Sequence, residues 1–162
     1  MNRCLTPISA AMLAIALTGL FAAGRCEAQA RASDSEEGFA DLLAGDPAKT
    51  WRGYAKDEWP AGWEVKDGAL HRIGGGGDIM TKDTFRSFDL RFEWKISKAG
   101  NSGVMYRVGT GDPQPYFSGP EYQVLDNDEH PDGKLETHRA GALYDLIAPA
   151  KKAVKPVGQW NA

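Results

Sequence analysis

The segment 119–127, with the sequence GPEYQVLDN, combines a strand-like pattern with polar groups that could do chemistry. Successive side chains of a β-strand point to opposite faces of a sheet, so Glu121 and Gln123 share a face with Leu125, whereas Tyr122 and Val124 lie on the other face. A carboxylate and an amide two residues apart could form one half of a functional site. The alternative is a half-buried structural strand whose polar face meets water.

An acidic loop with the sequence DEHPDG follows at residues 128–133. When this loop is aligned with the calcium-binding loop of an EF-hand, Gly133 fits the sixth position, but His130 and Arg139 fall at the third and twelfth positions, which need oxygen ligands. The loop is therefore not an EF-hand. His138 comes after the loop and could act as a base or a ligand, and the alternative is a solvent-exposed loop histidine.

A framework of strands must position these polar residues. Residues 88–96 alternate between apolar and charged side chains, which is typical of a strand with one buried face. The dipeptide Asp67-Gly68 lies between two alternating arms and predicts a tight hairpin turn. Further strands are predicted at residues 79–81, 104–108 and 141–147, and another begins at 159–161.

Short strands separated by turns, without helical periodicity, predict an all-β sandwich of the jelly-roll type. A strand that only begins at residues 159–161 would leave an open sheet edge, which folded proteins usually avoid. We therefore expect residues 38–162 to form a single β-sandwich domain that is incomplete at its C-terminus.

The first thirty residues predict a signal peptide. An apolar run follows Arg3, and the small-x-small pattern Ala28-Gln29-Ala30 marks a cleavage site. Residues 1–30 are then removed and residues 31–37 form a flexible polar leader, so the protein is expected to be periplasmic or secreted, with no membrane contact after cleavage.

Composition excludes several other functions. Both cysteines, Cys4 and Cys26, lie in the predicted signal peptide, so neither a disulfide nor a cysteine metal site is expected in the remaining chain. The formal net charge of −3 provides no basic field that would attract nucleic acid. No Lys-Ser/Thr pair follows the glycines at 74–77, so no nucleotide-binding loop is predicted.

Three blocks of sequence together resemble the 3-keto-disaccharide hydrolase family, which is also described as 3-keto-glucoside lyase and 3-keto-2-hydroxy-glucal hydratase. The blocks are Gly100–Gly103 with Tyr106-Arg107, the segment 119–127, and Gly141–Tyr144 with Ala148-Pro149 and the segment 156–161. The resemblance implies a concanavalin-like β-sandwich, an exported protein and a sugar substrate. Members of the family continue into further strands after the last block.

The chemistry that the resemblance implies is an elimination followed by a hydration. A ketone at C3 of a glucoside acidifies the hydrogen at C2, so a base can remove it while the aglycone leaves C1. The catalytic residues then expected are Glu121, His138 and Arg107, where Arg107 either pairs with Glu121 or stabilises an enolate. A divalent metal on Glu121 and His138 could serve as stabiliser, and no nucleotide or organic cofactor is expected.

The same resemblance suggests substrate-binding residues, namely Gln123, Asp126, Asn127, Tyr106 and Asn101. For several of these a structural role is the alternative. Asp126 and Asn127 are residue types that often cap turns, and Asn101 is of a type more often found in turns than in binding sites.

Two other functions compete with the enzyme. A non-catalytic carbohydrate-binding module on the same fold would bind sugar without turnover. An ordinary retaining glycosidase would need two carboxylates about 5 Å apart. Because Gln123 and Leu125 follow Glu121 on its strand face, where sandwich glycosidases carry further acids, this function ranks third.

Overall fold

The structure, a computed structural model, describes residues 38–162, so the predicted signal peptide and leader lie outside the described residues. The described chain is built from short strands with little helix, which confirms the all-β class; the jelly-roll arrangement stays a prediction. Three two-stranded antiparallel sheets form. They pair β1 (Trp51–Gly53) with β4 (Ile79–Thr81), β2 (Trp63–Lys66) with β3 (Ala69–Arg72), and β5 (Asn101–Met105) with β6 (Glu121–Leu125).

The helical elements of residues 38–162 are all short. They are α1 (Pro47–Thr50) and three 3-10 turns, η1 (Pro115–Phe117), η2 (Pro131–Lys134) and η3 (Glu136–His138). The helix α1 starts where Asp46 caps it, because the Asp46 carboxylate accepts a hydrogen bond from the backbone N–H of Ala48 at 3.0 Å. No helix in residues 38–162 is long and apolar enough to cross a membrane.

The predicted hairpin is confirmed as β2 and β3. Asp67 and Gly68 both adopt positive φ angles, 51° and 72°, which is the backbone that a two-residue hairpin turn requires. The predicted strand at 79–81 is confirmed as β4.

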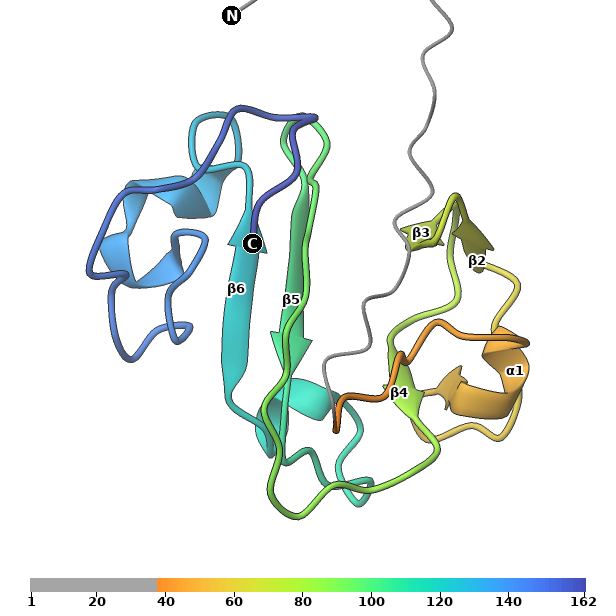
Figure 1. The fold of residues 1–162 in the computed structure, drawn as a ribbon. Helices are drawn as coiled ribbons and strands as arrows, with labels where there is room; N and C mark the ends of the chain where they lie inside the picture. The colour runs from red at the N-terminus through yellow and green to blue at the C-terminus, as the bar shows by residue number, and fades with distance from the viewer. Residues whose placement is uncertain (1–37) are drawn as a thin grey trace, which may run out of the picture. The chain divides into compact units, whose positions relative to one another are not determined.

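The sheet of β5 and β6 supports the core. Figure 1 shows β5 and β6 side by side, and in their register Met105 lies opposite Glu121 and Gly103 lies opposite Gln123. Val124 and Leu125 are buried with Trp94 and Ala140, and partly buried apolar side chains pack around them. Gln123 is also buried, so the last residues of β6 are covered on both faces, and the alternative of a polar strand face that meets water does not hold beyond Glu121.

The predicted strand at 88–96 is wrong for most of its length. Within the described residues its one β-bridge is at Trp94, which exchanges two backbone hydrogen bonds of 2.9 and 2.8 Å with Asn161, and the carbonyl of Ile96 accepts one more from Gly158 at 3.1 Å. The apolar residues of this stretch are also not all buried: Trp94 lies in the core, whereas the side chains of Phe88 and Leu90 are 47% and 41% exposed. Alternation alone cannot supply the neighbouring backbone that a strand requires.

Two other strand predictions need correction. The strand expected at 104–108 starts and ends earlier, as β5, because the turn lies at Ser97–Gly100 and Arg107 adopts a positive φ of 56°. The strand expected at 141–147 is a tight loop, in which Leu143 and Ile147 exchange backbone hydrogen bonds with each other.

Candidate functional site

Glu121 begins β6 and lies half-buried on the same sheet face as Gly103. Its carboxylate lies directly over Gly103, in space that any side chain at that position would occupy. Burial raises the pKa of the Glu121 carboxyl group, and the negative charge of Asp78 raises it further. A raised pKa lies closer to neutral pH. A carboxyl group with such a pKa can both take up and release a proton during a reaction.

Tyr144 lies beside Glu121 because the loop after Gly141 runs along β6. Its backbone N–H donates to the carbonyl of Glu121 at 2.9 Å, and its hydroxyl donates a long hydrogen bond of 3.5 Å to Asp132. Burial raises the pKa of the Tyr144 phenol, and the charges of Asp132 and Glu121 add to this effect. The phenol therefore stays protonated, and its one hydrogen is held only by the long bond to Asp132, which a nearer acceptor would replace.

His138 is held against Tyr144. The two rings stack with their centroids 4.3 Å apart and an interplanar angle of 28°. The Nε2 atom of His138 lies 3.2 Å from a carboxylate oxygen of Asp145, whereas its Nδ1 atom is buried and has no hydrogen-bond partner among residues 38–162. Tyr144 thus connects Glu121 to His138, which brings two of the three predicted catalytic residues into one cluster.

The sequence did not identify Tyr144, Asp78 or Gly103 as members of this cluster. Tyr144 is 23 positions from Glu121 in the printed sequence, and Asp78 is 43 positions away. Alternation within β6 places the Glu121 side chain but says nothing of which loop approaches it. The one available signal for Tyr144 was its place in the block Gly141–Tyr144.

Arg107 does not join the cluster. It lies beyond the end of β5, its side chain is exposed, and the ion pairs and hydrogen bonds among residues 38–162 include none between Arg107 and Glu121. Tyr106 donates its backbone N–H to Pro120 at 3.2 Å, which ties the end of β5 to the start of β6.

Gln123 and Asn101 form a structural pair. Gln123 is 1% exposed; its amide nitrogen donates to the side-chain oxygen of Asn101 at 3.3 Å and its oxygen accepts from the N–H of Val124 at 3.2 Å. A buried amide whose groups are already bonded is not presented to a ligand. The structure therefore favours a structural role for Gln123.

The side chains of Asp126 and Asn127 accept hydrogen bonds from backbone N–H groups. The Asp126 carboxylate accepts hydrogen bonds from the N–H groups of Ala99, Asp128 and Glu129 at 2.7, 3.1 and 3.4 Å. The side-chain oxygen of Asn127 accepts from the N–H of Ala140 at 2.9 Å. Of the two roles considered for these residues, the geometry favours the capping of turns.

Replacing Asp126 by asparagine should lower the melting temperature more at pH 7 than at about pH 3. The hydrogen bond from the Ala99 N–H, with those from Asp128 and Glu129, lowers the pKa of Asp126 in the folded state. Stability from an acid with a lowered folded pKa is present above its unfolded pKa, about 3.9, and is lost as the pH falls through the folded pKa. Thermal unfolding at both pH values measures the difference.

The control for this prediction is Asp128→Asn, which removes the same charge from an exposed neighbour. Its effect on the melting temperature should be small at both pH values, because the Asp128 side chain is exposed. If Asp126→Asn lowered the melting temperature equally at both pH values, the predicted stabilisation by the ionised Asp126 carboxylate would be contradicted.

The expected metal site on Glu121 and His138 does not fit the described residues. Within residues 38–162, no group of three or more His, Cys, Asp or Glu side chains converges so that it could hold a metal ion. The Nε2 atom of His138 already faces Asp145, and its other ring nitrogen, Nδ1, is buried. No catalytic step is therefore assigned to a metal here.

Comparison with known proteins adds information about the whole chain. A family model described as a 3-keto-alpha-glucoside-1,2-lyase-like domain matches residues 38–162. A 3-keto-disaccharide hydrolase from Bacteroides thetaiotaomicron is 38% identical to the chain over a match that covers 77% of this chain and 51% of the relative. The chain therefore spans about half the length of this curated relative.

A solved structure from Parabacteroides distasonis, provisionally named a glycosyl hydrolase, has a similar fold. It superimposes with a TM-score of 0.62 at 32% sequence identity, over 68% of this chain and 55% of the other. The sequence relative and the structural neighbour are thus both named as hydrolases that act on sugars.

Proposed function

The chain belongs to the 3-keto-alpha-glucoside-1,2-lyase-like family, and from this premise we propose that it takes part in cleaving 3-keto-glycosides, with Glu121 as the base. The observation that carries the proposal is the position of Glu121. Its carboxyl group is half-buried on a paired strand, its pKa is raised by burial and by Asp78, and the backbone N–H of Tyr144 is hydrogen-bonded to the Glu121 carbonyl. A base whose pKa is closer to the working pH transfers protons more effectively.

The proposed reaction has two steps. In the first, the Glu121 carboxylate takes the proton at C2, the C2–H electron pair forms a double bond between C1 and C2, the C1–O bond breaks, and Glu121 passes the same proton to the oxygen of the departing aglycone. In the second, water adds across this double bond, with hydroxide at C1 and a proton at C2. The products are the aglycone alcohol and the free 3-keto sugar.

Tyr144 has a separate role in this scheme. Negative charge accumulates on the ketone oxygen at C3 as the C2 proton leaves. A protonated phenol can donate a hydrogen bond to that oxygen and so stabilise the charge. The raised pKa keeps the Tyr144 phenol protonated, which supports this assignment. His138 holds the Tyr144 ring by stacking on it, and its Nε2 atom lies 3.2 Å from a carboxylate oxygen of Asp145.

The proposal includes a small sugar substrate and an exported protein. Export rests on the signal-peptide pattern of residues 1–30. A 3-keto-glycoside in the periplasm or outside the cell would then reach the enzyme without entering the cytoplasm.

A carbohydrate-binding module is the second candidate, and one observation favours it. Tyr116 and Phe117, on η1, are 58% and 63% exposed, and their ring centroids lie 4.8 Å apart. Exposed aromatic rings on a loop can offer an apolar surface to a sugar ring.

The test incubates the purified natural gene product with a 3-keto-glucoside and with the matching ordinary glucoside, each with and without EDTA, and follows the released aglycone. Release from the 3-keto-glucoside alone would support the proposal. Release from the ordinary glucoside would favour the retaining glycosidase, and binding of either sugar without release would favour the binding module. Loss of release in EDTA would show that a metal is needed.

A further inference from the structure

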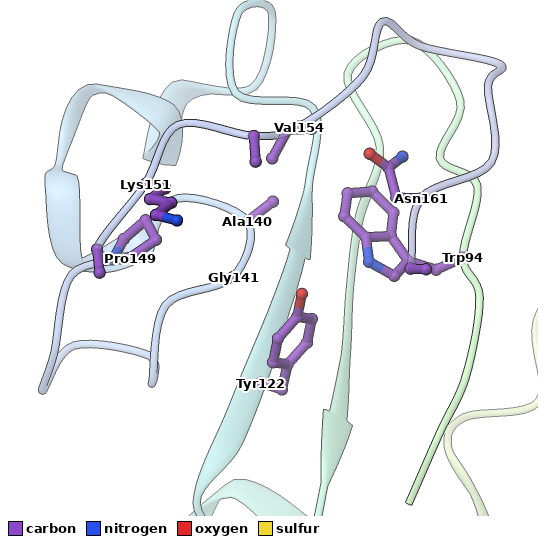
Figure 2. A pocket seen from close by; sticks show the side chains of 11 residues that line it. Trp94, Tyr122, Ala140, Gly141, Pro149, Lys151, Val154 and Asn161 are labelled. Carbon is purple, nitrogen blue, oxygen red and sulfur yellow. The ribbon is translucent and has the colours of Figure 1, made fainter.

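A small pocket lies on the other face of β6 from Glu121. Tyr122 contributes to its wall, and Tyr122 and Glu121 are adjacent strand residues whose side chains point to opposite faces. The pocket has a volume of about 180 Å³. Figure 2 shows it between the segment that carries Pro149 and Lys151 and the indole ring of Trp94. It is therefore separate from the cluster proposed for catalysis.

The pocket contains a buried hydrogen-bond donor that has no partner. Trp94 is only 7% exposed, and its indole N–H is buried without a hydrogen bond to any residue in 38–162. In Figure 2 the indole nitrogen is on the side of the ring that faces Gly141 and the Tyr122 hydroxyl. Buried donors in folded proteins are nearly always satisfied, so an unsatisfied one calls for an explanation.

Neighbouring side chains do not supply the missing acceptor. The side-chain oxygen of Asn161 accepts from the N–H of Lys155 at 2.8 Å, and its nitrogen donates to the carbonyl of Gln159 at 3.2 Å. The Tyr122 hydroxyl makes no hydrogen bond with another described residue and can itself donate. The residues that line the pocket include no Asp or Glu.

The charge and walls of the pocket indicate what would fit. Lys151 brings a positive charge, and in Figure 2 its ammonium group is directed toward Ala140. Pro149, Val154 and several alanines provide apolar walls. A cavity of roughly 150 Å³ can bind benzene, so this one has room for a six-membered ring.

We propose that this pocket binds a small organic acid, a carboxylate attached to an apolar ring. The carboxylate accepts hydrogen bonds from the Trp94 indole and the Tyr122 hydroxyl, and the Lys151 ammonium balances its charge. The ring packs against the apolar wall. This site is independent of the reaction proposed for Glu121, so either proposal can fail without the other.

The probe is benzoate, and its neutral isostere benzamide is the comparison. In a spectrum of protein labelled with 15N at the five tryptophans, benzoate should shift the indole N–H signal of Trp94 in a saturable way and leave the others nearly unchanged. Triple-resonance experiments assign that signal without a substitution. No shift of the Trp94 signal, or an equal and equally tight shift with benzamide, would overturn the proposal.

Lys151→Gln and Lys152→Gln form a matched pair of variants, because they remove the same charge at adjacent positions and only Lys151 lines the pocket. Lys151→Gln should weaken benzoate binding about tenfold, as expected for the loss of a charge-assisted contact, whereas Lys152→Gln should leave it within a factor of two, roughly the scatter between neutral surface changes. Equal weakening by both variants would mean that only the general charge of the surface attracts benzoate, and this too would overturn the proposal.

Discussion

Glu121→Gln should reduce the turnover of a 3-keto-glucoside by about 10²- to 10⁴-fold, the usual contribution of a positioned base. Glutamine has nearly the same shape as glutamate but cannot accept the C2 proton. The variant should fold normally. Because the folded pKa of Glu121 is raised, ionisation of this group opposes folding at pH 7, and its removal should leave the melting temperature equal or slightly higher.

The measurement is the rate of aglycone release at saturating substrate, together with the melting temperature of the same sample. Glu58→Gln is the matched control, because it makes the same chemical change at an exposed side chain, and its turnover should equal that of the unmodified protein. A Glu121→Gln variant that keeps more than about half of the original rate would be incompatible with a general base at this position.

Gly133→Ala should destabilise the protein by about 1–3 kcal/mol, the usual cost of forcing an extra carbon into packed structure. A side chain at Gly133 would overlap the backbone carbonyl of Asn127, which cannot rotate away as a side chain could. The Asn127 side chain also holds Ala140, so the displacement should reach the start of the loop that carries Tyr144.

Urea denaturation followed by tryptophan fluorescence measures this loss as a lower midpoint with an unchanged slope. Gly111→Ala is the control, because nothing lies within 4 Å of the position that its new carbon would occupy. The control should change the free energy of unfolding only slightly. If both glycine variants unfolded at the same urea concentration, the close packing of Gly133 against Asn127 would be refuted.

Features that depend on residues close together in the chain were predictable from the sequence. The hairpin of β2 and β3 follows from Asp67-Gly68, because a positive φ at two consecutive residues is a local requirement. The strand β6 follows from alternation over five residues, and with it the sheet face on which Glu121 lies. The family resemblance was also visible in three blocks of sequence and is confirmed by the family match.

Features that depend on contacts between distant segments were decided only by the tertiary structure. The stretch 88–96 alternates as a strand should, yet among the described residues only Trp94 forms a β-bridge, since pairing needs a second segment at the right distance. Gln123 and Asp126 have the residue types of ligands, but packing buried them, and their hydrogen bonds go to backbone N–H groups and to the Asn101 side chain.

The cluster of Glu121, Tyr144 and His138 shows the same division. The sequence by itself determined that a carboxylate stands at the start of a strand in a member of this family. The raised pKa of that carboxylate depends on burial and on Asp78, and the stacked rings depend on a loop that folds back along β6. Burial and electrostatic interaction vary with distance in space, which residue types and spacing along a chain do not specify.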